Sequence, residues 1–171
     1  GETHDDSAVF TNTKETSTGI ISTTVTVTIT GANDTPTFTV ATKSAAVAEV
    51  TDDTDDTTYT VTGDFTFTDE DRNSEYGKGD INLNDNSTRG TFEVTAVENV
   101  TADATKNISG TQRYKVSWSY SGNKGDMKDL GAGETHDDSA VFTNTKETST
   151  GIISTTVTVT ITGANDTPTF T

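Results

Sequence analysis

The sequence predicts an all-β protein, folded as an antiparallel β-sandwich of about seven strands. Apolar and polar residues alternate with a period of two in several segments, for example residues 114–120 (YKVSWSY) and 157–162 (VTVTIT). This alternation is typical of strands that bury one face of a sheet. Clusters of Gly, Asn and Asp separate these segments, and no stretch shows the 3.6-residue period of an amphipathic helix. Short strands with turn residues between them are the pattern of a sandwich.

The linker at residues 32–36 (ANDTP), which recurs at residues 164–168, marks where each unit begins. Proline cannot donate a backbone hydrogen bond to a β-ladder, so this segment is expected to lie between domains. After it, each run rich in β-branched and aromatic residues is a candidate strand, and Trp118 and Tyr120 are expected to point into the core. The expected strands are residues 44–50, 57–68, 90–97, 111–120, 139–145 and 152–162, with a weaker one near residues 80–84.

The charge of the chain excludes several classes of function. Its 171 residues carry 27 Asp and Glu against 11 Lys and Arg, a formal net charge of -16. Nucleic acid and anionic lipid both bind basic surfaces, so neither nucleic acid nor direct membrane contact is expected. No run approaches the roughly 18 apolar residues of a membrane span, and the absence of Cys excludes disulfides and thiolate metal sites. The expected ligands of so acidic a chain are cations.

Calcium is the cation that this composition favours. Leu, Ile, Val and Phe total 31 of 171 residues, a content so low that a folded core needs additional stabilisation. Asp69 and Asp71 stand at the end of an expected strand with one residue between them, so both can face one side of the loop that leaves the sheet. Carboxylate oxygens are the ligands that Ca²⁺ prefers. We therefore expect this pair to bind Ca²⁺, whose charge also reduces the repulsion among carboxylates.

An internal repeat divides the chain. Residues 1–39 recur without change as residues 133–171, so the period is 132 residues, the size of a whole small domain. This pattern predicts a window on a tandem array of independently folded units. An isolated strand pair is marginal in water, so the duplicated N-terminal pair is expected to be mobile or to pair with a neighbouring molecule. The expected parts are residues 1–33, the C-terminal strand pair of a preceding repeat, residues 34–165, one complete sandwich, and residues 166–171, the start of the next linker or repeat.

Five motifs follow one another through the unit. They are residues 63–71 (GDFTFTDED), 90–94 (GTFEV), 118–120 (WSY), 130–135 (LGAGET) and 157–166 (VTVTITGAND). Together, and in this order, they resemble the VCBS or bacterial cadherin-like repeats of very large RTX-type adhesins. The resemblance implies an immunoglobulin- or cadherin-like sandwich in an extracellular surface protein exported by type I secretion. There the repeat is a calcium-stiffened extender, or spacer, in adhesion and biofilm formation.

The resemblance also implies calcium ligands at the unit boundaries. In such repeats the linker carries an Asn-Asp pair and binds ions that both flanking units share. Neighbouring repeats of the same chain are therefore the implied partners, through calcium-bridged linkers. Further ligands are implied in the first strand and before the penultimate strand. The implied ligands are Glu49, Glu134, Asn165 and Asp166, with the first-copy equivalents Glu2, Asn33 and Asp34.

Two functions from different classes stay open at this point. One is the structural spacer, and the other is a module that itself binds glycan, a host protein or a like repeat. Identical tandem copies favour the spacer because each copy adds reach, whereas a groove lined by aromatic residues would favour the binding module. Catalysis is not expected, because the chain lacks a glycine-rich phosphate loop and a Ser-His-Asp set in a nucleophile elbow. His136 is expected in an exposed loop, and Asp80, Asp85 and Asp126 are expected to shape turns rather than to bind metal weakly.

Overall fold

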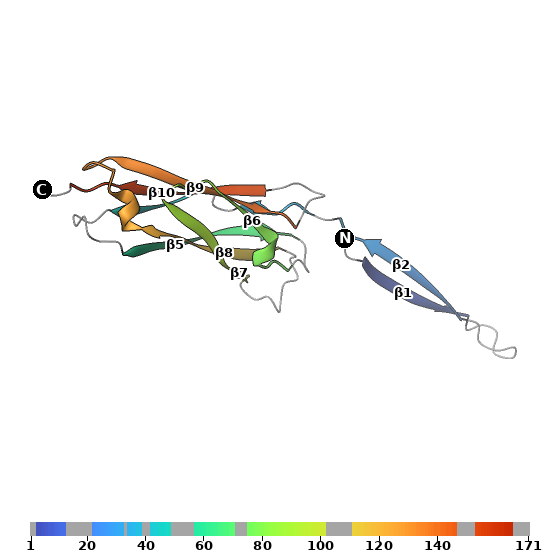
Figure 1. Ribbon diagram of the computed structural model, residues 1–171. Coiled ribbons are helices and arrows are strands. Elements are labelled where there is room, and N and C mark those ends of the chain that lie inside the picture. Colours follow the sequence, from blue (N-terminus) through green and yellow to red (C-terminus); the bar gives the residue numbers. More distant parts are fainter. Residues whose placement is uncertain are drawn as a thin grey trace, which may run out of the picture. The chain divides into compact units, whose positions relative to one another are not determined.

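The computed structural model divides the chain into two compact units, Gly1–Asn33 and Asp34–Thr171 (Figure 1). We call the first unit the N-terminal hairpin and the second unit the body. Among the described residues, no helix is both long enough and apolar enough to cross a membrane. The described residues are 3–12, 22–32, 34–38, 42–48, 57–70, 75–101, 111–146 and 153–165.

The body is a sandwich of two four-stranded sheets, as the alternating sequence predicts. In spatial order, the first sheet consists of β4 (Thr42–Ala48), β10 (Ile153–Thr162), β9 (Thr135–Asn144) and β6 (Ile81–Asp85). The second consists of β3 (Thr37–Phe38), β5 (Thr58–Asp69), β8 (Gln112–Asn123) and β7 (Gly90–Asn99). Two short 3₁₀-helices flank these strands, η1 (Lys78–Asp80) before β6 and η2 (Lys124–Met127) after β8.

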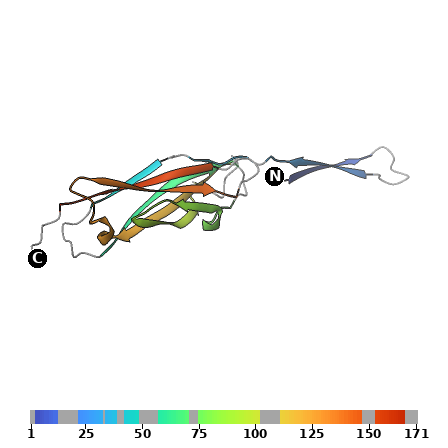
Figure 2. The ribbon, with the colours of Figure 1, turned by 45° about the horizontal axis from the view of Figure 1, so that its top comes forward.

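Every strand expected from the sequence is present, with ends that differ by a few residues, and the weak segment near residues 80–84 is β6. Two features were not expected. β3 is a two-residue strand, and β4, which lies beside β10 (Figure 2), runs parallel to it. In this pairing Thr42 is opposite Thr156. The parallel pair has a simple cause. A chain that enters a sandwich at one end and leaves at the other has first and last strands that run in the same direction.

The strand registers define two opposite ends of the body. At the proximal end, residues 34–36 lead into β3, β5 ends at Asp69, and β10 begins. At the distal end, β9 begins and β10 ends with Thr135 opposite Thr162, and the chain continues into residues 163–165. η1 lies at the proximal end and η2 at the distal end (Figure 1). The two described linker segments therefore lie at opposite ends of the body.

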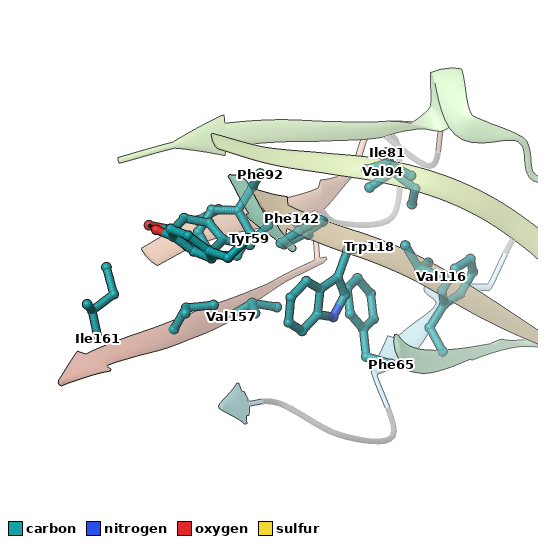
Figure 3. Close-up of a cluster of buried hydrophobic side chains, with 14 of the residues drawn as sticks. Tyr59, Phe65, Ile81, Phe92, Val94, Val116, Trp118, Phe142, Val157 and Ile161 are labelled. Atoms are coloured by element: carbon teal, nitrogen blue, oxygen red, sulfur yellow. Dashed lines mark hydrogen bonds between the residues drawn. The ribbon is translucent and has the colours of Figure 1, made fainter. Parts of the chain in front are cut away.

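Aromatic side chains dominate the core between the two sheets. Trp118 and Tyr120, both predicted as core residues, are 2% and 0% exposed. Phe142 of β9 meets Phe65 of β5 and Phe92 of β7, with ring centroids 5.3 and 6.3 Å apart (Figure 3). Each ring buries a large apolar area, and edge-on contacts between rings add to that stabilisation. The body therefore forms a core although the chain has few aliphatic residues.

The N-terminal hairpin has the strand pairing of β9 and β10 without their burial. It consists of β1 (Thr3–Thr11) and β2 (Ser22–Thr30), with Thr3 opposite Thr30. The identical residues of the body pair in the same register. Every side chain of β1 and β2 is exposed: Phe10 is 61% exposed, whereas its twin Phe142 is 0% exposed. Local sequence thus determines the hairpin, and tertiary contacts determine whether its apolar face is buried.

This difference gives a prediction with an internal control. Phe142→Ala should lower the free energy of unfolding of the body by about 3–5 kcal/mol, because it removes a fully buried ring and leaves a cavity. Phe10→Ala makes the same chemical change in an identical local sequence and should change it by less than about 0.5 kcal/mol. Urea unfolding followed by the fluorescence of Trp118, the one Trp of the chain, measures both. Equal losses in the two variants would contradict this assignment of the core.

Candidate functional site

The candidate site at the proximal end is built around Asp69, the last residue of β5. Its side chain is 1% exposed, and its Oδ2 accepts a 2.6 Å hydrogen bond from the hydroxyl of Tyr76. Tyr76 is itself held by edge-on ring contacts with Phe67 and Tyr114, at centroid distances of 4.9 and 4.8 Å. A carboxylate that leaves water needs such donors, because uncompensated burial of a charge is costly. Aromatic packing therefore sets the position of this predicted calcium ligand.

The linker before β3 reaches the same end of the body as Asp69. β3 pairs antiparallel with the last residues of β5, so residues 34–36 continue past the end of β5. Pro36 is buried there, whereas Asp34 is exposed. Pairing of β3 with β5 thus brings two predicted ligands, Asp34 and Asp69, to one end of the body although they are far apart in the sequence.

A polar network lies beside Asp69 that sequence reasoning missed. Gln112, which pairs with Asp69 in the ladder, accepts two 2.8 Å hydrogen bonds at Oε1, from Asn99 Nδ2 and from the hydroxyl of Tyr114. Burial and the negative charges of Asp69 and Glu75 raise the pKa of Tyr114 to about 12, so it stays a neutral donor at physiological pH. No motif marks these residues. The pairing of β5, β7 and β8 alone brings them together.

At the distal end, the predicted ligands Glu134 and Asn165 are both exposed. Glu134 Oε2 accepts a 2.9 Å hydrogen bond from the backbone N–H of Gly131. The N–H of Gly163 donates to the carbonyl of Glu134 (2.8 Å), and the N–H of Gly133 donates to the carbonyl of Gly163 (3.0 Å). Gly133 has a φ of 78°, a conformation that favours glycine. Glu134 therefore closes the turn before β9, and this role needs no metal.

The remaining predicted ligands fall outside the described residues. Within the described part of the chain, no group of three or more His, Cys, Asp or Glu side chains is arranged to hold a metal ion. Asp34 and Asp69 share the proximal end, and Glu134 and Asn165 share the distal end, so the described residues supply two members of each candidate site. The ligands that lie outside the described residues are Glu2, Asn33, Glu49, Asp71 and Asp166.

Asp138 in β9 is a buried carboxylate that sequence reasoning did not single out. Its side chain is 1% exposed and accepts 2.9 Å hydrogen bonds from the backbone N–H groups of Thr88 and Arg89. The hydroxyl of Tyr120 also donates to it, and His136 Nε2 lies 3.0 Å from its Oδ1. The prediction that His136 lies in an exposed loop is therefore wrong, because β9 begins before it and its side chain is partly buried against Asp138.

These contacts hold the turn between β6 and β7 in place. Burial raises the pKa of the Asp138 carboxyl, but the hydrogen bonds from Tyr120, Thr88 and Arg89 outweigh it and bring the pKa below its usual value. Arg89 also forms a bidentate ion pair with Asp129, at 2.5 and 2.8 Å, and its hydrogen bonds lower the pKa of Asp129 to about 2. Both carboxylates are ionised at neutral pH, and their role is structural.

Two of the three acidic residues expected to shape turns, Asp80 and Asp85, do so. Asp80 Oδ2 accepts a 2.8 Å hydrogen bond from the N–H of Gly77 at the start of η1. Asp85 Oδ1 accepts hydrogen bonds from the N–H (2.9 Å) and the hydroxyl (2.5 Å) of Ser87. This is the local side-chain to backbone pattern that favours Asp in turns. Both side chains therefore have a structural role within their own loops.

The buried carboxylate predicts a defined pH dependence. Asp138→Asn should lower the free energy of unfolding by about 1–3 kcal/mol at pH 7, because buried donors lose a charged acceptor. A folded pKa below the unfolded value of about 3.9 means that the stabilisation is complete above that value and is lost as the pH falls through the folded pKa. The gap between the variant and the wild type should therefore be fully present at neutral pH and should narrow below about pH 4.

Asp137→Asn is the matched control for that experiment, because Asp137 is the preceding residue of β9 and is exposed. Its stability should stay within about 0.5 kcal/mol of the wild type at neutral pH. Urea unfolding at each pH measures all three proteins. An equal effect of the two substitutions, or a gap that widens in acid, would contradict the assigned role of Asp138.

Comparison with known proteins gives structural neighbours only. No protein-family model matches the chain, and no curated protein matches it. The chain is similar to cadherin-like domains 1 to 4 of zebrafish RET, with a TM-score of 0.47 and 11% identity, over 97% of this chain and 34% of that one. It is also similar to the sialic acid binding region of a Streptococcus sanguinis SK1 adhesin bound to 3'sLn, with a TM-score of 0.35 and 14% identity, over 81% of this chain and 33% of that one. The chain thus spans about a third of each of these structures.

Proposed function

We propose that residues 34–165 are a calcium-stabilised extender unit of a large bacterial cell-surface adhesin. The unit is one of a tandem series that holds distal adhesive domains away from the cell, for adhesion and biofilm formation. It acts outside the cell, after type I secretion, and its role is mechanical. The observation that carries the proposal is the position of the two linker segments, residues 34–36 and 163–165, at opposite ends of one body.

This arrangement of the linker segments makes an array of such units extended rather than compact. When a chain enters a unit at one end and leaves at the other, each added unit extends the array along the strands. At about 3.4 Å per residue and ten to twelve residues per strand, one unit adds about 40 Å. The parallel pairing of β4 with β10 serves the same geometry, because both strands run from the proximal to the distal end. The identical 39-residue repeat, 132 residues apart, is consistent with a series of such units.

Calcium is proposed at the junction between units. The proposed ligands at the proximal end are Asp69 and Asp34, joined by Asp71 of the same loop and by Glu2 and Asn33 of the preceding segment. All are oxygen donors, which suits Ca²⁺. Bound calcium supplies the positive charge that lets several carboxylates lie close together. The corresponding distal set is Glu134, Asn165 and Asp166, and Glu49 is the proposed ligand in the first strand.

A glycan-binding role has less support. Sugar-binding platforms need exposed aromatic rings, and in the described part of the body every aromatic side chain is buried or half-buried. The half-buried ring is Phe38, which packs edge-on against Phe65 and Phe67. The aromatic side chains in the described part of the body therefore belong to its core. The spacer is the better supported of the two functions left open by the sequence.

Calcium should raise the melting temperature of the chain by about 5–10 °C per site. Binding to the native state alone, at a hundredfold excess over Kd, adds about 2.7 kcal/mol for each site. Calorimetric melting in millimolar calcium and in excess EDTA measures the shift. Asp34→Asn should reduce the shift, whereas Asp64→Asn, at a position that is also exposed but lies in the middle of β5, should leave it unchanged. Equal melting temperatures in calcium and EDTA would rule out calcium stabilisation.

Calcium should also stiffen the junction between units. In a protein of two complete units, small-angle scattering in calcium should give a maximum dimension set by two extended units, about 80 Å plus the linker. Removal of calcium, or alanine at the positions of Asp34 and Asp69 in the second unit, should shorten it as the junction becomes a hinge. Alanine at the position of Asp64 is the control. The junction is not the stiffening element if all these samples have the same maximum dimension while their domains stay folded.

A further inference from the structure

The N-terminal hairpin exposes the side chains that fill the core in its twin. Its apolar face consists of four large residues that are 49–61% exposed, whereas their four counterparts in β9 and β10 are 0% exposed. An exposed apolar face of this size on a two-stranded sheet marks an interaction surface. The residues are Phe10, Val25, Val27 and Ile29, and their twins are Phe142, Val157, Val159 and Ile161.

The hairpin also carries the polar contact of its twin. His4 Nε2 lies 3.1 Å from Asp6 Oδ1, as His136 Nε2 lies 3.0 Å from Asp138 Oδ1 in the body. Its strands already pair in the register that β9 and β10 have. The hairpin is therefore preorganised for the contacts that its twin makes, which lowers the ordering cost of binding.

The rest of the body forms a binding site for such a hairpin, and we call this site, bounded by β4, β6 and the second sheet, the socket. β9 and β10 are the two central strands of their sheet, between β6 and β4. Without them, β4 and β6 would lose their only described neighbours in the sheet, and the core rings of β5, β7 and β8 would lose their cover. Residues 34–132 thus hold a place for one hairpin, and the chain contains two hairpins of identical sequence.

We infer that the N-terminal hairpin can close the socket of a second copy of this chain, in the place of β9 and β10. Its own body is out of reach while β3 stays paired with β5. In that place Thr30 would lie where Thr162 lies, at the distal end, while Thr37 starts β3 at the proximal end. The six residues between them, which make seven Cα–Cα steps, span at most about 25 Å, less than the roughly 30 Å length of β10. This interaction goes beyond the extender role and does not depend on calcium at the junctions.

Matched substitutions in the full chain test the inference. Phe142→Asp with Val159→Asp places charges on the apolar face of β9 and β10, the C-terminal hairpin, so that this face can no longer be buried. Phe10→Asp with Val27→Asp makes the same changes in the N-terminal hairpin. A fourfold variant disables both. All are examined in millimolar calcium by near-ultraviolet circular dichroism, urea unfolding and light scattering. Protein concentration is varied about a hundredfold, because the unfolding midpoint of an assembly depends on concentration and that of a monomer does not.

The N-terminal variant should be a folded monomer whose unfolding midpoint is independent of concentration. The C-terminal variant should fold only in assemblies of at least twice the 18.0 kDa chain mass, with a midpoint that rises with concentration. The fourfold variant should show no cooperative unfolding. The inference is overturned if the C-terminal variant is as unfolded as the fourfold variant at every concentration, or if it folds as a monomer. Failure here leaves the calcium response of the wild-type chain untouched, so the two proposals fail separately.

Discussion

The burial of one face of β9 and β10 against the aromatic face of β5, β7 and β8 is the interaction on which the rest of the body depends. Phe142 lies between Phe65 and Phe92, and Val157, Val159 and Ile161 of β10 are fully buried in the same core. Because the chain has few aliphatic residues, these aromatic contacts carry a large share of the apolar burial. They also place the end of β10 at the distal end, and with it the linker that follows.

Some acidic residues of the body stabilise its fold, and others are proposed to bind calcium. Asp138 and Asp129 are satisfied within the body, by the hydroxyl of Tyr120, by backbone N–H groups and by Arg89, and their low pKa values reflect those donors. Asp34 and Asp69 lie at the end that the linker enters, where Asp69 accepts a hydrogen bond from Tyr76 and where we propose that calcium binds. Charge density by itself therefore does not separate the structural carboxylates from the proposed ligands. The carboxylate with the richest set of donors serves the fold.

One sequence of 39 residues in two environments separates local from tertiary effects. The strands and their register are the same in both copies, because the alternation of Val, Ile and Thr favours one pairing. Burial differs completely, because it depends on a second sheet that only one copy contacts. A strand pair that forms locally therefore still needs a second sheet to bury its apolar face, as β9 and β10 do in the body. The exposed face of the N-terminal hairpin is the surface that we propose to bind a second copy.

The sequence by itself determined the all-β class, the position of nearly every strand, the core role of Trp118 and Tyr120, and the duplicated hairpin. These features depend on local alternation and turn residues, which a sequence displays directly. Only the tertiary structure decided the parallel pairing of β4 with β10, the proximity of Asp34 to the end of β5, and the donors around Asp138. These depend on which strands become neighbours, and strand pairing over long sequence separations leaves no periodic signal. The calcium ligands stay a prediction because their geometry depends on loops between strands and on a neighbouring unit.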